Sequence, residues 1–318
     1  MRTESAITPI DERAFRRRWL RILLVVILLA GTLGGGGHLL VRSAGVSIDV
    51  AELSESSGLA ASHRNPGILW SHNDSGPETA LFAFTTDGSP VARLYLEGID
   101  WYDWEDLAVG PDAAGDPFAA LYLGDIGDNF AVREFVQVHR VDEPDLSAVV
   151  PGDPVVLSVP VETFRLTYDD GPRDAETLFI DPRDGVAWVI EKAMSDRVPL
   201  YRADLSGGAG TRVLERVQEI DVPGAIGLTR LATGGAISPE ADRIVVRTYV
   251  AGWVWWVQPG QSIPDAMASE PDRLSLPVMR QGEAVTFSAD GERLYVTSEG
   301  VPAPLGSVAA PAPGSSTD

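Results

Sequence analysis

Acidic residues recur at one position of a repeated phrase, and this recurrence is the strongest chemical signal in the sequence. The phrases at 105–108, 176–179 and 283–286 each open with Glu, and an Asp stands two residues before the first two of these glutamates. Carboxylates gathered in one place repel one another, so some must take up a proton or share a cation. Ca²⁺ suits such a set because it accepts six to eight oxygen ligands in loose geometry. The predicted Ca²⁺ ligands are Asp103, Glu105, Asp174, Glu176 and Glu283.

A structural role is the alternative for the same acids. Side chains repeated in this way can cap backbone amides between neighbouring units, and no metal is then required. The repetition is also incomplete, because the fourth phrase, 236–239, is preceded by Gly235 and opens with Ala236. Both interpretations remain open on the sequence alone.

A second group of polar residues follows the apolar strand that comes next in each unit. Lys192, the only lysine of the chain, and Arg247 place two cations beside the acids. They could hold a phosphoryl or carboxylate group against a bound metal, or they could simply neutralise Glu176 and Glu191. His72 could act as a general base or pack as a hydrogen-bonded residue. The predicted ligand-binding residues are His72, Asn73, Asp74, Asp125, Lys192 and Arg247.

The elements that must position these residues are short strands in a repeat. The phrases begin at residues 57, 105, 176, 236 and 283, each at the start of an alternating strand, and a more apolar strand follows each one. Third and fourth strands follow in most units, and Gly, Asp and Pro occur at the joins. Four strands per unit, repeated along one chain, are typical of a β-propeller. We therefore predict an all-β chain with a single β-propeller, in which equivalent positions converge at one end of the axis.

The ends of the chain bear on the number of blades. In the fifth unit, the sequence after the second strand is long enough for only one further strand, at 304–309. The segment 46–53 has no partner in the first unit, and as the fourth strand of the last blade it would close the ring without a long exposed edge. Five blades over 46–310 are favoured, and six are possible if a unit is hidden in 142–170 or 204–233. The tail 311–318 is expected to be disordered.

Several phrases resemble a family of exported bacterial β-propellers of unassigned function, similar to phytase-like and esterase-like propellers and to TolB-type repeat propellers. The resemblance covers roughly residues 50–300. It implies propeller architecture and leaves activity open, because this fold hosts catalysts and inert binders alike. The phrases that carry it are 57–60, 72–76, 104–108, 124–129, 174–176 and 282–284.

The N-terminus predicts attachment to a membrane. A basic segment, 1–21, precedes an apolar run at 22–41 that is long enough to span a bilayer as a helix. Arginines on the N-terminal side favour retention of that end in the cytoplasm, with the propeller outside. A cleaved signal peptide is the alternative, although Arg42 stands where a small residue is wanted.

Charge and composition exclude several classes of function. Residues 1–42 carry seven arginines and three acids, so the rest of the chain carries 18 basic and 43 acidic residues, a net charge near −25. Such a field repels nucleic acid and attracts cations. The absence of cysteine excludes disulfides and thiolate chemistry.

Two functions follow as expectations. The first is a membrane-anchored extracytoplasmic binding module for a ligand or protein, with a Ca²⁺ ion on the axis. The second is a Ca²⁺-dependent hydrolase of an ester or phosphoester.

Overall fold

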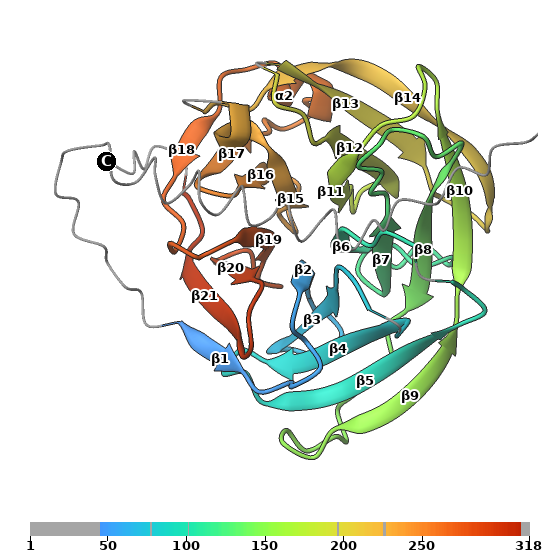
Figure 1. Cartoon of the computed structure of the whole chain (residues 1–318), viewed down its shortest axis with the longest axis vertical. Helices are drawn as coiled ribbons and strands as arrows, with labels where there is room; N and C mark the ends of the chain where they lie inside the picture. Colours follow the sequence, from blue (N-terminus) through green and yellow to red (C-terminus); the bar gives the residue numbers. More distant parts are fainter. Residues whose placement is uncertain (1–44, 77, 101, 196, 225–226, 313–318) are drawn as a thin grey trace, which may run out of the picture. The chain divides into compact units, whose positions relative to one another are not determined.

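The computed structural model describes residues 45–76, 78–100, 102–195, 197–224 and 227–312. Strands surround one axis in successive four-stranded sheets (Figure 1), which confirms the expected all-β propeller. We number the sheets as blades 1 to 5 in chain order. Within each blade the first strand lies nearest the axis and the fourth lies at the rim.

The blades have the following strands. Blade 1 contains β2 (Ser56–Ala61), β3 (Ile68–Asn73), β4 (Ala80–Thr85) and β5 (Pro90–Glu97). Blade 2 contains β6 (Asp106–Gly110), β7 (Ala120–Asp125), β8 (Val136–Asp142) and β10 (Glu162–Tyr168). Blade 3 contains β11 (Ala175–Ile180), β12 (Val186–Glu191), β13 (Arg197–Asp204) and β14 (Gly210–Asp221). Blade 4 contains β15 (Ala232–Ile237), β16 (Arg243–Thr248), β17 (Gly252–Trp256) and β18 (Asp272–Leu274). Blade 5 contains β19 (Gly282–Phe287), β20 (Arg293–Ser298), β21 (Ala303–Ala309) and β1 (Val46–Ile48). A 3₁₀ turn, Gly227–Arg230, precedes blade 4, and a short helix, α2 (Ile263–Met267), lies between β17 and β18.

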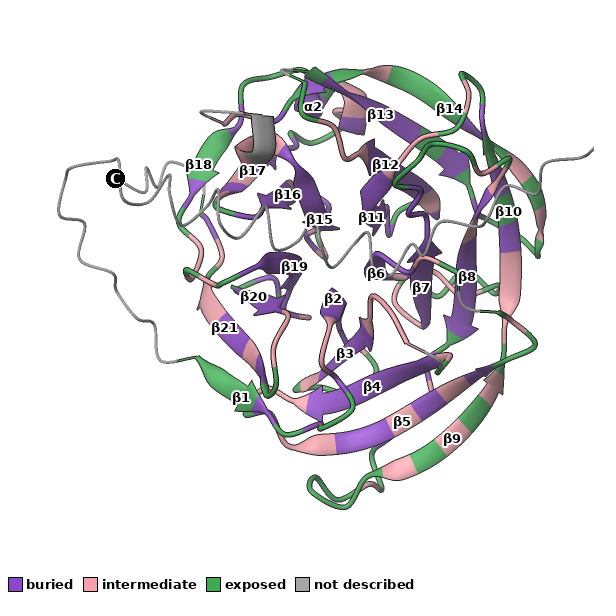
Figure 2. Ribbon diagram, viewed as in Figure 1, coloured by how far each residue is buried: buried purple, intermediate pink, exposed green. Residues whose placement is uncertain are grey.

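Burial decreases from the axis to the rim, and this explains the residue pattern of each strand. Every residue of β2, β11 and β19 is buried, because neighbouring blades cover both faces of these strands. The rim strand β14 instead mixes buried and exposed residues, as Figure 2 shows. Among the described residues, the buried apolar side chains form five clusters, one at each blade-to-blade border.

The predicted closing strand is present. β1 pairs antiparallel with β21, with Val46 opposite Leu305 and Ile48 opposite Ala303. The strand is shorter than the predicted 46–53 and ends at Ile48. The chain beyond it still contributes to the core, because Leu53 is fully buried.

The region 142–170, where a hidden sixth unit was possible, has a different role. The chain leaves blade 2 after β8 and adds β9 (Val155–Pro160) parallel to β5 of blade 1. It then returns as β10, which pairs with β8 and also, in parallel, with β14 of blade 3. Blades 2 and 3 therefore form one continuous eight-stranded sheet. In blade 4 the fourth strand, expected near 274–278, ends at Leu274.

The predicted membrane anchor at 22–41 lies outside the described residues, as does the end of the tail, 313–318. Within the described part of the chain, no helix has the length and apolar character needed to cross a bilayer.

Candidate functional site

The predicted acids lie at one end of the ring axis. First strands begin at this end and second strands finish there, since successive strands of a blade run antiparallel. We call this end the acidic mouth and define it by Asp74, Asp103, Glu105, Asp174, Glu176 and Glu283.

Three carboxylates at the mouth lie close enough together to hold a metal ion. One ligand oxygen from each of Asp74, Asp103 and Glu105 lies within 4.8 Å of the other two. Asp103 and Glu105 belong to the predicted metal set, whereas Asp74 was predicted to contact a ligand. The carboxylates come from blades 1 and 2, which form one side of the mouth.

The backbone at Gly127 lies directly beside two of these carboxylates. A Cβ atom at this position would collide with Oε1 of Glu105 and Oδ2 of Asp103. The Gly127 amide also donates to the Asp103 carbonyl at 3.2 Å. The backbone therefore approaches the carboxylates as closely as a residue without a side chain allows. Two of the carboxylates lie against this backbone, and together with Asp74 they form an all-oxygen donor set, which is suited to a hard cation such as Ca²⁺.

Arg133 fixes the loop that carries Gly127. Its Nη2 pairs with Oδ1 of the buried Asp125 at 2.8 Å, and its Nη1 donates to the Gly127 carbonyl at 2.7 Å. Burial raises the pKa of Asp125 above its ordinary value, although Arg133 opposes the effect. The guanidinium also lies 4.2 Å from the centre of the Tyr102 ring. Asp125 therefore helps to position the loop that carries Gly127, because it holds the Arg133 guanidinium.

Glu176 and Asp174 have protein partners. Oε1 of Glu176 pairs with the Lys192 ammonium, while its buried Oε2 has no hydrogen-bond partner among the described residues. Burial raises the pKa of Glu176 to about 8, although Lys192 opposes the shift. Burial alone would lower the pKa of Lys192, but Glu176 and the nearby Tyr249 and Asp174 raise it overall. Asp174 accepts the Asp128 amide at 2.9 Å, so this part of the mouth matches the capping alternative.

Glu283 lies on the side of blade 5 and is 7% exposed. Burial raises its pKa to about 7, and the charge of Glu299 contributes to the rise. Strand pairing identifies Thr233 as the equivalent residue of blade 4, because the same irregularity of register separates Ala232 from Gly234 and Gly282 from Ala284. The alignment of Ala236 with Glu283 was therefore wrong by three residues. The missing carboxylate in blade 4 is nonetheless a feature of the mouth.

Arg247 lies between blades 4 and 5 and is 2% exposed. Its guanidinium lies against Gly282, where a Cβ atom would collide with it, and Nη1 donates to the Ala284 carbonyl at 3.3 Å. Burial lowers its pKa to about 10, with the charge of Glu283 acting in the opposite direction. The structure thus places Arg247 at the border between two blades.

His72 and Asn73 are held within blade 1. His72 is fully buried, its Nδ1 lies 3.1 Å from the Asn73 carbonyl, and its ring meets Trp104 edge-on. Burial lowers the pKa of His72 to about 4, so the ring is neutral near pH 7. The side chain of Asn73 accepts the amides of Ser54 and Glu55 at 2.9 and 3.0 Å. Both side chains therefore bond to the protein's own backbone.

Below the mouth lies Asp106, which is fully buried. Its Oδ2 accepts the Leu178 amide at 2.9 Å and the Gly235 amide at 3.1 Å, and its Oδ1 accepts the Leu107 amide at 2.9 Å. Burial raises its pKa well above the ordinary value, against these hydrogen bonds. The Asp106 carboxylate therefore joins the first strands of blades 2, 3 and 4, below the acids of the mouth.

Apolar side chains are exposed on loops at the same end of the ring as the acidic mouth. Twelve large apolar residues of the described chain are exposed, and seven of them lie on loops that begin or end at the acidic mouth. Val278 and Val301 are 75% and 71% exposed. We call these seven residues the apolar collar: Tyr102, Phe130, Val132, Met194, Val250, Val278 and Val301.

Comparison with known proteins gives no family. No family model matches the chain, and no curated protein sequence matches it. Among solved structures, the PQQ-bound aldose sugar dehydrogenase of Streptomyces coelicolor is 12% identical, with a TM-score of 0.43 over 85% of this chain and 98% of that chain. A nidogen/laminin complex is 13% identical, with a TM-score of 0.40 over 77% of this chain and 73% of that chain. The hydrazine synthase of Kuenenia stuttgartiensis is 15% identical, with a TM-score of 0.38 over 82% of this chain, which spans 59% of that chain. These are β-propeller proteins, and no residue role is transferred from them.

Sequence reasoning missed three features of the site: the position of Asp74 beside Asp103 and Glu105, the close approach of Gly127, and the hydrogen bonds by which Asp106 joins three blades. The segment 124–129 offered a signal, because two glycines among acids directly after a strand indicate a close backbone approach. Asp106 follows the opening Glu105, and no equivalent phrase has an acid at that place.

Proposed function

We propose that this protein is a membrane-anchored binding module whose acidic mouth and apolar collar contact a ligand or protein outside the cytoplasm. The observation that carries the proposal is that most exposed large apolar residues of the described chain lie on loops at the same end of the ring as the carboxylates. Exposed apolar side chains gathered in one region mark interaction sites, whereas those scattered singly need no explanation.

A Ca²⁺ ion held by Asp74, Asp103 and Glu105 is part of the proposal. The three carboxylates come from two blades, and two of them lie against the backbone of Gly127. The ion would supply positive charge that offsets their mutual repulsion, and the chain's own role is to orient these oxygens through Arg133 and its loop. Ca²⁺ is favoured over Mg²⁺ because it tolerates irregular oxygen geometry.

A Ca²⁺-dependent hydrolase of an ester or phosphoester has less support. The two cations that could hold an anionic substrate are engaged, since Lys192 pairs with Glu176 and Arg247 lies buried against Gly282. The apolar collar is also more typical of a docking surface than of an ester-hydrolysing site.

Site-specific photocrosslinking in intact cells tests the docking surface. A photoreactive amino acid at Val278, Val301 or Met194 should give adducts that disappear in an Asp74→Asn, Asp103→Asn background. The matched controls are Val156 and Val213, which are exposed on rim strands away from the mouth. Equal adducts from the collar and the rim valines, or adducts unaffected by the mouth substitutions, would remove the proposal.

A further inference from the structure

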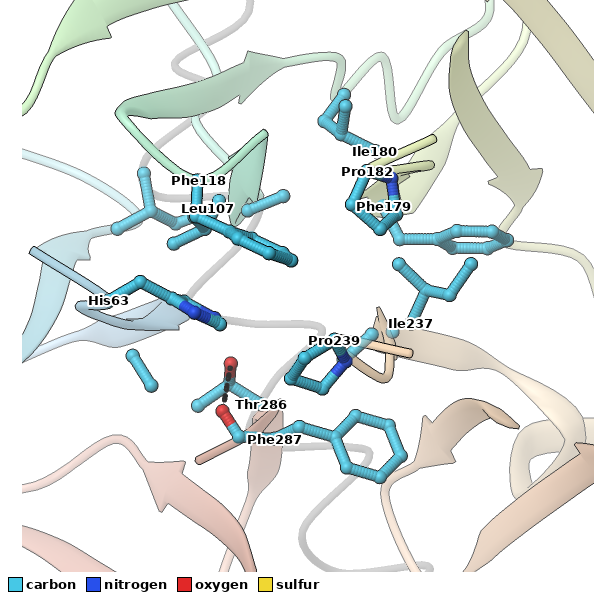
Figure 3. A pocket seen from close by; sticks show the side chains of 15 residues that line it. His63, Leu107, Phe118, Phe179, Ile180, Pro182, Ile237, Pro239, Thr286 and Phe287 are labelled. Atoms are coloured by element: carbon cyan, nitrogen blue, oxygen red, sulfur yellow. Dashed lines mark hydrogen bonds between the residues drawn. The ribbon is translucent and has the colours of Figure 1, made fainter. Parts of the chain in front are cut away.

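The opposite end of the ring axis holds a small apolar pit. It lies where the first strands end, has a volume of about 40 Å³ and is lined by residues of all five blades. Figure 3 shows the His63 and Phe118 rings side by side on one wall, with Pro182, Ile237 and Pro239 across the space. The two rings are stacked, with their centres 3.9 Å apart and their planes at 4°.

Most side chains of the lining are apolar, although backbone groups also line the pit. A buried water needs two to four polar partners, and a volume of this size holds about three waters or one short aliphatic group. The side chains with polar atoms in the lining are His63 and Thr286, and the Thr286 hydroxyl donates to the Phe287 carbonyl at 3.3 Å. Burial lowers the pKa of His63 below its ordinary value, which favours the neutral ring.

The pit is separate from the acidic mouth. Leu107 and Gly235 line it, and the amides of both residues donate to Asp106. The Asp106 carboxylate thus lies between the two ends of the axis, and a group in the pit cannot reach the proposed Ca²⁺ site.

Acidic turns surround the pit. The five turns that join first and second strands, 62–67, 111–119, 181–185, 238–242 and 288–292, lie at this end of the axis. Arg64 and Arg183 are their basic residues. Arg183 pairs with Asp181, and Arg243, at the start of β16, pairs with Asp242 and Glu240. The eight acidic residues of these turns are Asp112, Asp116, Asp181, Asp184, Glu240, Asp242, Asp290 and Glu292.

We propose that this end of the propeller is a second docking site, which binds a basic segment of another protein and takes one aliphatic side chain of that segment into the pit. The acidic turns attract and orient the basic residues, and the pit selects a side chain of about the size of valine or leucine. The axis therefore carries two independent sites, one at each end.

The test uses the full-length chain and fluorescein-labelled pentapeptides of the form Arg-Arg-Xaa-Arg-Arg, with binding followed by fluorescence anisotropy. Because burial of one aliphatic side chain contributes about 1.5 kcal/mol or more, the Leu and Val peptides should bind at least about tenfold more tightly than the Gly peptide. Glu-Glu-Leu-Glu-Glu should not bind. Equal affinity of the Leu and Gly peptides would overturn the proposal, since charge alone would then explain the binding.

Variants locate the site. Ala236→Leu and Ala108→Leu fill the pit from two different blades, and either one that folds should abolish the preference for Leu over Gly without weakening the Gly peptide. Glu240→Gln with Glu292→Gln should weaken all the basic peptides, and the matched pair on rim strand β14, Glu215→Gln with Glu219→Gln, should do so less. An unchanged Leu preference in both filled variants would refute the pit. Loss of that preference in the Asp74→Asn, Asp103→Asn variant would assign the binding to the acidic mouth and overturn the proposal as well.

Discussion

The carboxylate of Asp106 accepts the backbone amide of Gly235 at 3.1 Å, although the two residues belong to blades 2 and 4, which are not neighbours in the ring. The same oxygen accepts the amide of Leu178 in blade 3. One side chain can span three blades only where the first strands lie close to the axis. This hydrogen bonding fixes the relative positions of three strands that also carry or flank the acids of the mouth.

Asp106→Ala should lower the free energy of unfolding by about 3 kcal/mol or more, because it leaves two amides of other blades buried without acceptors, at about 1 to 3 kcal/mol each. Urea denaturation of the full-length chain would measure the loss. Asp100→Ala, at an exposed position, is the control. A loss below about 1 kcal/mol would show that water or neighbouring groups replace the carboxylate.

Millimolar Ca²⁺ should raise the melting temperature of chelator-treated protein by several degrees, and Mg²⁺ should raise it less. Binding to the folded state alone stabilises by about 2.7 kcal/mol at a hundredfold excess over the dissociation constant. The Asp74→Asn, Asp103→Asn variant should lose the response. Glu176→Gln should keep it, because Glu176 pairs with Lys192. If Ca²⁺ does not raise the melting temperature of the wild-type protein, the proposed Ca²⁺ site is wrong and the acids act as structural caps.

Glu283 should make the metal-free protein less stable as the pH rises. Its pKa is raised from 4.5 to about 7, so the folded state binds a proton that the unfolded state releases across this window. Stability should therefore fall between pH 4.5 and 7 and level off above pH 7, with a contribution of up to about 3 kcal/mol. Comparison of denaturation curves for wild-type and Glu283→Gln protein isolates this contribution. Identical pH slopes for the two proteins would contradict it, and Glu97→Gln at an exposed position is the control.

Removal of residues 1–45 should leave a cooperatively folded propeller, whereas removal of 1–54 should not. The longer deletion removes β1 and three buried side chains, Ile48, Val50 and Leu53, each worth about 1.5 to 3 kcal/mol. It also exposes the edge of β21 to unwanted pairing. Calorimetry and light scattering would compare the two chains. Equal melting behaviour would show that closure by β1 is dispensable.

Protease added to intact spheroplasts should remove the propeller. The prediction rests on the arginines ahead of the apolar run at 22–41, which orient a span with its N-terminus in the cytoplasm. An outside marker protein should be digested in parallel. If the marker is cut while the propeller stays protected, the predicted topology is wrong.

The repeat in the sequence was sufficient to predict the propeller and the closing role of its N-terminal segment. Alternation of apolar and polar residues reports how a strand is buried, but it does not identify the strand's neighbour. Accordingly, fourth strands were expected in most units, while the parallel pairing of β10 with β14 across blades 2 and 3 was not. In blade 4, Gly234 and Gly235 have no side chains, so the alternation of apolar and polar residues is interrupted there. The predicted alignment of this strand with the other first strands was therefore wrong.

The same limit applies to the site. Repetition predicted that Glu105, Glu176 and Glu283 lie at one end of the axis, because equivalent positions of a ring converge, and Asp103 is only two residues from Glu105. Asp74 reaches them from a loop of blade 1, and Gly127 does so only because Arg133 bonds its carbonyl. Contacts of this kind depend on how loops of different blades meet, and no periodic pattern encodes them.

The parallel pairs β5 with β9 and β10 with β14 make the ring mechanically uneven. Backbone hydrogen bonds run continuously from blade 2 to blade 3, and the chain passes directly from β9 on the edge of blade 1 to β10, so the arc of blades 1 to 3 should be the stiffer one. Blades 4 and 5 are separate four-stranded sheets, and each has a three-residue fourth strand. Thermal breathing of the ring should therefore concentrate in the arc of blades 4 and 5, beside Thr233 and Glu283. A bulky ligand would enter the mouth by parting that flexible arc while the carboxylates of blades 1 and 2 stay in place.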